Sequence, residues 1–374
     1  MRRTVFLLFV AAVIGLVSEP AARAQGCIVA RSSELTAGPE SQGGYLVPGE
    51  WDITIGYRHQ FSFRHFVGPT EQVYRIQQGT QVMNKINLQN LNVTYQATPR
   101  FSFSASIPLL LASRRSNNSP YTTATQGFGD TIVTAQGWLW NPHENTRGNV
   151  AIGLGVMLPT GNDHVKNRVD AFNGKGPQDV LLDYSIQPGS GGYGIVFQWQ
   201  SFKNLPNATQ IYFNGSYIAT PQNTNGVLRS ATGNPLTAYV SISDQYLLEA
   251  GVAHALKRVR GLTLTFGPRW EGVPASDLFG DSLGFRRPGF AISLMPGVQY
   301  SHGRSLFTAA VGKAIYRDRT RSVPDKMTGG HGDAAFADYI WLASYSVRFG
   351  GRHDASNAAA HQSKPVGLAR NGYN

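Results

Sequence analysis

The stretch 338–349 alternates between two kinds of side chain, and this alternation limits the folds open to the chain more than any other feature. One parity is apolar or aromatic: Tyr339, Trp341, Ala343, Tyr345, Val347 and Phe349. The other parity carries Asp338, Ser344, Ser346 and Arg348. Because successive side chains of a strand point to opposite faces, the pattern predicts a β-strand. Its unbroken aromatic face predicts that the strand faces lipid and closes a transmembrane antiparallel β-barrel.

The N-terminus has the pattern of a secretory signal peptide. Arg2 and Arg3 precede an apolar run of 13 residues, Val5 to Val17, and a small-x-small cleavage site follows at Ala22-Arg23-Ala24. A run of this length falls short of the roughly 20 residues that a transmembrane helix needs. We therefore expect residues 1–24 to be removed and the mature protein to reach the outer membrane of a Gram-negative bacterium.

Composition and charge agree with a barrel. The chain has 42 Gly, 16 Tyr, 19 Phe and 6 Trp beside only 15% charged residues. Its net charge is +11, but Lys and Arg are scattered and form no dense basic patch, which argues against nucleic-acid binding. The positive charge favours a basic lumen or attraction to anionic lipopolysaccharide and other outer-membrane lipid.

Twelve segments have the strand pattern, so the predicted fold is an all-β barrel of twelve strands. They lie near residues 51–61, 83–97, 101–111, 129–141, 149–159, 193–202, 209–220, 236–249, 261–271, 289–301, 305–316 and 338–349. Five connections are short, and six are longer, near 62–82, 112–128, 160–192, 221–235, 272–288 and 317–337. Alternating short periplasmic turns and long outer loops are typical of bacterial barrels. A thirteenth candidate, Val180 to Ile186, would break this alternation, so we assign it to an outer loop.

The barrel is expected to span residues 51–349, with both ends in the periplasm. The segment 25–50 is rich in Gly, Ser and Pro and is either a flexible periplasmic lead or a plug in the barrel mouth. Residues 350–374 are expected to form a flexible tail. Fourteen strands are the alternative, if part of 25–50 and one loop also pair.

Two finer expectations concern individual strands. Apolar parity switches from Ile86 and Leu88 to Leu91, Val93 and Tyr95, which predicts a β-bulge near Gln89 or Asn90. Aromatic residues near strand ends are expected in the girdles at the membrane interfaces. These are Trp51, Trp138, Trp140, Trp270 and Trp341.

Charged residues on the inner parity are the candidates for function. Arg58, Arg269 and Glu271 can line the path through the lumen and select solutes. Asp52 and Arg348 fall near the periplasmic end of the first and last strands, where a salt bridge would close the seam, although separate contacts with lumen water explain them equally well. The longest loop, 160–192, is the candidate lid or constriction.

The chain shows no sign of an enzyme, a metal site or a cofactor. The histidines fall mostly in loops, and no spacing suggests a nucleophile with a base. The segment Gly329 to Asp333 offers one His and one Asp, too few ligands for a metal ion. Transport or binding is therefore favoured over catalysis.

Three segments carry a family resemblance: GFGD at Gly127–Asp130, GLGVMLPTG at Gly153–Gly161 and SIQPGSGGYG at Ser185–Gly194. Together they resemble the phenol meta-pathway (MetA-pathway) degradation family of bacterial outer-membrane proteins. The resemblance implies a barrel related in style to the long-chain fatty acid transporters, with a role in the uptake of hydrophobic or aromatic compounds. It implies neither a defined substrate nor a catalytic residue.

The last strand also resembles the C-terminal signal of bacterial outer-membrane proteins, which typically ends on Phe. Tyr345, Val347 and Phe349 are the residues that the barrel assembly machinery would then recognise. The expected function is an outer-membrane channel for passive uptake of small hydrophobic or aromatic solutes. The alternatives are a structural or adhesive barrel whose outer loops bind a partner, and a general diffusion porin.

Overall fold

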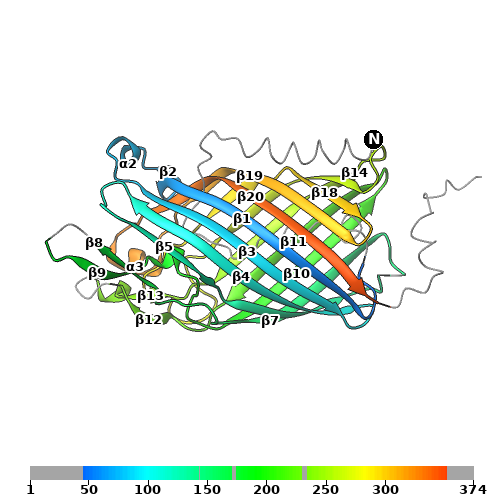
Figure 1. Cartoon of the computed structure of the whole chain (residues 1–374), viewed down its shortest axis with the longest axis horizontal. Helices are drawn as coiled ribbons and strands as arrows, with labels where there is room; N and C mark the ends of the chain where they lie inside the picture. The colour runs from blue at the N-terminus through cyan, green and yellow to red at the C-terminus, as the bar shows by residue number, and fades with distance from the viewer. Residues whose placement is uncertain (1–44, 143, 171–173, 230–233, 352–374) are drawn as a thin grey trace, which may run out of the picture.

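The strands form one closed antiparallel barrel. The computed structural model describes residues 45–142, 144–170, 174–229 and 234–351. The predicted signal peptide, most of the segment 25–50 and nearly all of the tail 350–374 lie outside these residues. The first and last strands pair with each other from Glu50 opposite Gly350 onwards, so the wall has no free edge. Figure 1 shows the strands running obliquely to the long axis of the barrel.

Twelve strands make the wall, as the sequence predicts, and the described residues do not form the fourteen-strand alternative. The uninterrupted strands are β1 (Glu50–Val67), β3 (Val82–Gln96), β4 (Phe101–Ser116), β7 (Gly148–Leu158), β10 (Gly194–Leu205), β11 (Thr209–Ala219), β14 (Gln245–Ala255), β19 (Ser305–Asp318) and β20 (Ala334–Gly350). The interrupted strands are β5/β6 (Thr122–Phe128 and Thr131–Trp138), β15/β16 (Leu262–Phe266 and Pro268–Val273) and β17/β18 (Gly289–Leu294 and Gly297–His302).

The interruptions occur at residues that do not fit the regular hydrogen bonding between neighbouring strands. Gly129 and Asp130 separate β5 from β6, and Met295 and Pro296 separate β17 from β18. Proline has no N–H to give to a neighbouring strand. Gly267 separates β15 from β16, and a Cβ there would lie 1.9 Å from the carbonyl oxygen of Ala250. One neighbouring strand pairs with both parts of each interrupted strand, so the wall stays closed.

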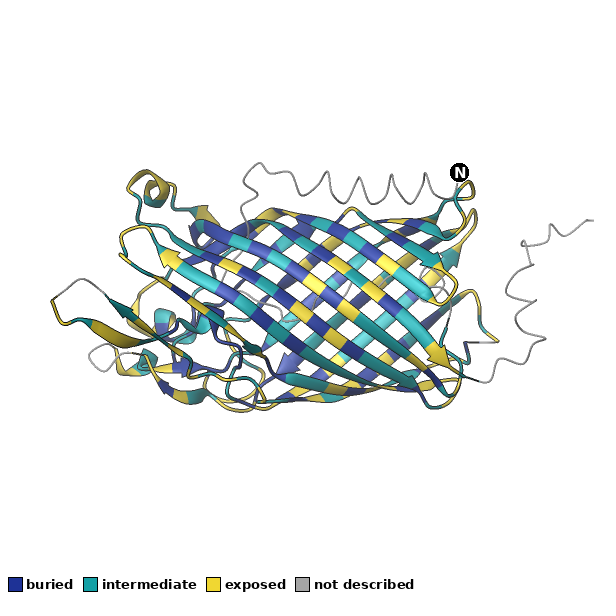
Figure 2. Ribbon diagram, in the orientation of Figure 1, coloured by how far each residue is buried: buried dark blue, intermediate teal, exposed yellow. Residues whose placement is uncertain are grey.

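The two faces of the wall differ in the way that a membrane barrel requires. Figure 2 shows exposed and buried residues alternating along the strands. The exposed outer face carries large apolar side chains such as Ile55, Leu154, Phe213 and Phe307, while the inner face is mostly polar. Because the hydrocarbon core is apolar, this outer face is the lipid-facing one.

One side of the wall is taller than the other. The adjacent strands β19, β20, β1, β3 and β4 have 14, 17, 18, 15 and 16 residues, whereas β7, β10, β11 and β14 have 11 or 12. About 9–11 residues suffice to span the hydrocarbon core. The strands of the tall side are therefore longer than the hydrocarbon core requires.

The long connections gather at one end of the barrel, on the left in Figure 1. They hold the small elements β2 (Thr70–Glu71), α2 (Tyr74–Gln77), β8 (Lys166–Asp170), β9 (Pro177–Leu181), η1 (Tyr184–Ile186), β12 (Thr224–Leu228), η2 (Pro235–Thr237), β13 (Tyr239–Ser241) and α3 (Val323–Thr328). The thirteenth strand candidate indeed lies outside the wall, since β9 pairs only with β8 and is followed by η1. Within the described part of the chain, no helix combines the length and the apolar content needed to cross a membrane.

Several predicted strand boundaries are wrong. Strand β1 continues to Val67, past its predicted end at residue 61, and β20 begins at Ala334, before its predicted start at residue 338. The predicted strand 236–249 begins only at Gln245, because the buried carboxylate of Asp244 accepts hydrogen bonds from the backbone N–H groups of Thr220 (2.7 Å) and Leu278 (2.8 Å) and so joins the loop after β11 to the loop after β16. The connection predicted near 112–128 is much shorter, because β4 continues to Ser116 and β5 already starts at Thr122.

Candidate functional site

The three motifs of the family resemblance meet at one buried carboxylate. Asp130 lies in the break between β5 and β6 and is 2% exposed. Its Oδ2 accepts hydrogen bonds from the backbone N–H (2.7 Å) and the hydroxyl (2.6 Å) of Ser190, and its Oδ1 accepts one from the N–H of Gly161 (3.1 Å). Both ends of the loop 161–190 are therefore fastened to the same point on the wall.

Two glycines make this fastening close. A Cβ on Gly189 would lie 2.1 Å from the carbonyl oxygen of Gly161, and a Cβ on Gly161 would lie 2.6 Å from the Cα of Gly189. The N–H of Gly189 also donates to the carbonyl oxygen of Asn162 (3.0 Å). The two backbones touch directly, which residues with side chains do not permit.

The same loop packs against the inner wall and explains the change of parity in β3. Leu182 and Ile186 of the loop form a buried cluster with wall residues that include Ile86, Leu88 and Leu110. The predicted bulge is wrong, because β3 pairs with β1 and β4 without a register shift around Asn90. In β3, the apolar residues Ile86 and Leu88 face inward, where the loop covers them, whereas Leu91 faces outward, where lipid covers it.

An ion cluster holds the middle of the loop. Asp183 accepts two hydrogen bonds from the guanidinium of Arg287, at 2.8 and 2.7 Å, and a nitrogen of Arg114 on β4 lies 3.4 Å from its Oδ2. Burial alone would raise the pKa of Asp183, but Arg287 and Arg114 hold the pKa of this carboxyl below its ordinary value. The charged form of Asp183 is therefore the one that anchors the loop.

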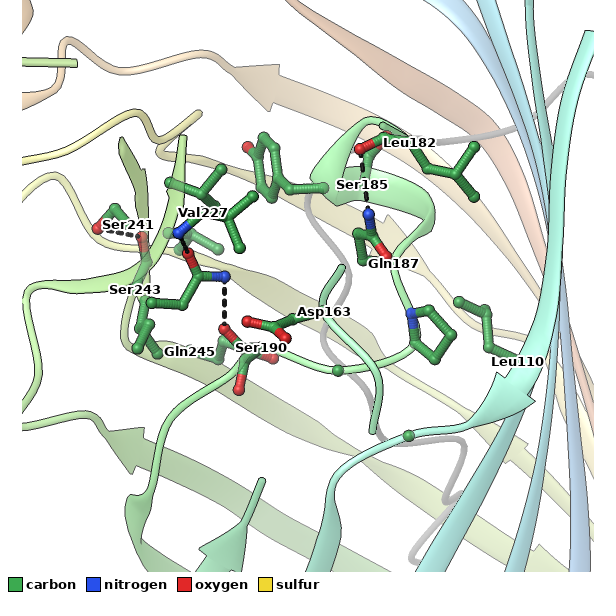
Figure 3. A pocket seen from close by; sticks show the side chains of 18 of the residues that line it. Leu110, Asp163, Leu182, Ser185, Gln187, Ser190, Val227, Ser241, Ser243 and Gln245 are labelled. Atoms are coloured by element: carbon green, nitrogen blue, oxygen red, sulfur yellow. Dashed lines mark hydrogen bonds between the residues drawn. The ribbon is translucent and has the colours of Figure 1, made fainter. Parts of the chain in front are cut away.

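The loop and the wall enclose a mostly apolar cavity of about 100 Å³, shown in Figure 3. Its apolar lining comes from the wall, from the loop 161–190 and from the loop between β11 and β14. The apolar lining residues include Leu88, Leu110, Leu182, Val227, Val240, Ile242 and Val273. The polar lining includes Ser185, Gln187, Ser190, Gln245 and Arg287.

The three inner charges expected to line the path meet in one buried network. Arg58 on β1 binds Glu271 on β16 at two points, Nη2 to Oε1 at 2.5 Å and Nη1 to Oε2 at 3.0 Å. Arg269 donates from Nε to Glu271 Oε2 (2.8 Å) and also pairs with Glu249 on β14. Both arginines are 0% exposed and Glu271 is 2% exposed.

This network crosses the lumen. Strands β20, β19 and β17 separate β1 from β16 on the wall, so the Arg58–Glu271 pair is a chord across the interior and not a contact between neighbours. Gln60 extends the network along β1 by accepting a hydrogen bond from Arg58 Nε (2.8 Å). Charges buried at this depth need such complete pairing.

An aromatic cluster lies at the end of the lumen opposite the long connections. Tyr45, five residues before β1, packs its ring edge-to-face on Trp138 of β6 with centroids 5.2 Å apart, and it reaches Phe202 of β10 at 6.1 Å. The girdle position predicted for Trp138 is wrong, because its side chain points into the barrel and is buried with Phe202 and Ala151. Lipid cannot contact it there.

The seam residues also come together. Asp52 and Arg348 lie directly opposite each other on β1 and β20, with Arg348 Nε 3.5 Å from Asp52 Oδ2. Tyr345 and Phe349 are exposed on the lipid-facing side of β20, 39% and 40% respectively, and Val347 shares their parity. Their recognition by assembly machinery stays a prediction.

Residues of the loop end do not assemble a metal site within the ranges that the structure describes. His331 bonds through Nε2 to the carbonyl oxygen of Arg319 (2.7 Å). Asp333 bonds instead to Nδ1 of His65 (2.7 Å) and to Arg75 (2.9 Å). The His and Asp of the Gly329–Asp333 segment thus take separate partners.

The sequence alone does not predict the roles of three residues, Glu249, Asp130 and Asp183. Glu249 shares the inner parity of Leu247 in β14, and a charge on that face was the available signal. Asp130 stands inside a quoted motif, but its partners lie 31 and 60 residues away in the chain. Asp183 carries no local signal, because its arginines come from a distant strand and a distant loop.

Comparison with known proteins supports the fold. No protein-family model and no curated protein matches the chain. An outer membrane channel from Pseudomonas putida F1 is similar in structure, with a TM-score of 0.52 and 12% identity over 82% of this chain and 97% of that chain.

Two further barrels are less similar. They are the translocator domain of the autotransporter NalP from Neisseria meningitidis, with a TM-score of 0.43 and 11% identity over 83% of this chain and 92% of that one, and the P. putida toluene transporter TodX, with a TM-score of 0.41 and 10% identity over 89% and 100%. The chain therefore has the fold of an outer-membrane channel, a closed all-β barrel of twelve antiparallel strands.

Proposed function

We propose that the protein is an outer-membrane channel for the passive uptake of small hydrophobic or aromatic molecules. The observation that carries the proposal is the apolar cavity inside the loop end of the barrel, between the wall residues Leu88 and Leu110 and the loop residue Leu182. A cavity lined mainly by apolar side chains favours apolar solutes, because water gains little by occupying it.

The proposal gives the buried charges a role in selection. Arg58, Arg269 and Glu271 form a constriction in the middle of the lumen that excludes hydrated polar solutes. Their side chains have almost no solvent exposure, so a hydrated solute would have to break several charge-assisted hydrogen bonds to pass.

The test is solute entry into liposomes that carry the refolded protein. A small aromatic solute is compared with a sugar of similar size, with protein-free liposomes as the baseline. The proposal expects faster entry of the aromatic alone. Equal acceleration of both solutes would indicate a general porin and would contradict it.

A structural or adhesive barrel is the second candidate, and the same buried network favours it. A network of fully paired charges across the lumen suits a barrel that passes nothing. If folded protein accelerates neither solute, this second function replaces the first, and the outer loops become the place to seek a partner.

A further inference from the structure

Two polar atoms in the cavity have no hydrogen-bond partner among the described residues. They are the hydroxyl oxygen of Ser185 on η1 and Oε1 of Gln245 at the start of β14, and both residues line the cavity. Ser185 is only 7% exposed, so bulk water does not satisfy its hydroxyl. Buried polar atoms without a partner cost free energy, which a ligand with a matching group would recover.

The neighbouring polar groups of the lining are already satisfied. Gln187 accepts from the N–H of Val165 (3.0 Å) and donates to the carbonyl oxygens of Val165 (3.1 Å) and Leu182 (3.2 Å). Ser190 donates to Asp130. Figure 3 shows Ser185 and Gln245 on opposite sides of the cavity, from different elements. The unmet hydrogen-bonding capacity is therefore concentrated at two defined positions.

The basic side chain of the lining already has its partners. Arg287 is held at two points by Asp183 and lies with its guanidinium carbon 4.9 Å from the ring centre of Tyr184. Asp163, the acidic lining residue, contacts Nδ1 of His164 at 2.5 Å. An anionic ligand would have to compete with Asp183 for Arg287, whereas a neutral ligand leaves the ion cluster intact.

We propose that this cavity is a binding site for a small neutral molecule with an apolar body about the size of one ring and a hydroxyl group. The volume of about 100 Å³ is of the order of the cavities that hold a benzene molecule. Oε1 of Gln245 accepts only and the hydroxyl of Ser185 both donates and accepts, so a ligand hydroxyl can donate to either one. The inference rests on the proposed function, since it names the class of solute that the channel holds.

The experiment measures binding to the full-length protein in detergent micelles, with protein-free micelles subtracted. The probes are benzyl alcohol, ethylbenzene, which replaces the hydroxyl by a methyl group, and benzoate, which carries a charged carboxylate in place of the hydroxymethyl group. Loss of one neutral hydrogen bond corresponds to about tenfold in affinity, so ethylbenzene should bind about tenfold more weakly than benzyl alcohol. Benzoate should bind more weakly still.

Two single substitutions test whether the Gln245 and Ser185 side chains cause the preference for benzyl alcohol. Gln245→Leu and Ser185→Ala should each reduce the preference for benzyl alcohol over ethylbenzene while keeping the apolar cavity. Ser243→Ala is the matched control, because this hydroxyl also lines the cavity but already contacts the hydroxyl of Ser241 at 3.5 Å. It should leave the preference unchanged.

The inference is overturned if ethylbenzene binds as tightly as benzyl alcohol, if benzoate binds best, if none of the three binds, or if both variants retain the full preference. Solute entry into liposomes separates this failure from that of the proposed function. Entry of aromatics without a hydroxyl preference overturns the binding site alone. A hydroxyl preference that depends on Gln245 or Ser185, without entry of any solute, overturns the uptake function and leaves the site standing.

Discussion

Arg58 and Glu271 face each other across the lumen and join at two points, with nitrogen–oxygen distances of 2.5 and 3.0 Å, although three strands separate them on the wall. Strands β1 and β16 therefore contact each other through their side chains alone. The pair bridges the interior of the barrel between two strands that lie four positions apart in the twelve-stranded wall.

Replacing one member of this pair should destabilise the barrel strongly. Glu271→Met leaves Arg58 buried without its carboxylate, which costs roughly 3–5 kcal/mol. The double variant Arg58→Met/Glu271→Met removes both charges and keeps Arg269 paired with Glu249, so most of the loss should be recovered. Urea unfolding of the three proteins in micelles provides the comparison. A double variant no more stable than the single one would show that the ion pair itself holds the barrel together.

Asp130→Ala should release the loop 161–190 from the wall. The carboxylate accepts three hydrogen bonds at the two ends of this loop, and hydrogen bonds to charged groups contribute roughly 1.5–3 kcal/mol each. Limited proteolysis should therefore cut the loop much faster than in the wild type. Asp179→Ala is the control, because Asp179 lies in the same loop with its side chain 63% exposed. Equal cleavage of both variants would refute the anchoring role of Asp130.

Gly189→Ala should disturb the same loop by a different route. The added Cβ would lie 2.1 Å from the carbonyl oxygen of Gly161, so one of the two backbones must move. Faster hydrogen exchange of the loop amides is the expected readout. Gly330→Ala serves as the control, since the nearest atom to its Cβ would be 3.5 Å away. Unchanged exchange in Gly189→Ala would mean that the two backbones need not touch.

The stability that the ion pairs of Asp183 contribute should depend on pH only in strong acid. Arg287 and Arg114 lower the pKa of Asp183 in the folded state below its unfolded value of about 3.9. The stabilisation is therefore complete above about pH 4 and is lost as the pH falls further. Asp183→Asn should be less stable than the wild type by the same amount at pH 7 and pH 5.5, and the difference should shrink below about pH 4. A difference that already shrinks between pH 7 and pH 5.5 would contradict this assignment.

The sequence predicts the wall better than the interior. Period-two alternation depends on neighbouring residues, so it identified the twelve wall strands and the inner parity of Arg58, Arg269 and Glu271. No local pattern shows that Arg58 meets Glu271 or that Arg287 meets Asp183. These contacts depend on the curvature of the barrel and on the path of the loops. Ile86 and Leu88 wrongly indicate a bulge for the same reason, because the loop that covers them comes from a distant segment.

The central claim is that the paired charges keep hydrated solutes out of the lumen, and ion current through a planar bilayer tests it most directly. The wild-type protein should conduct salt ions poorly, and Arg58→Ala/Glu271→Ala, which removes the bridge without filling its space, should conduct clearly more. Asp179→Ala, a change far from the bridge in an exposed hairpin, should conduct like the wild type. A large, steady wild-type current that the double variant leaves unchanged would show that water and ions already pass, and the account of the lumen would be wrong.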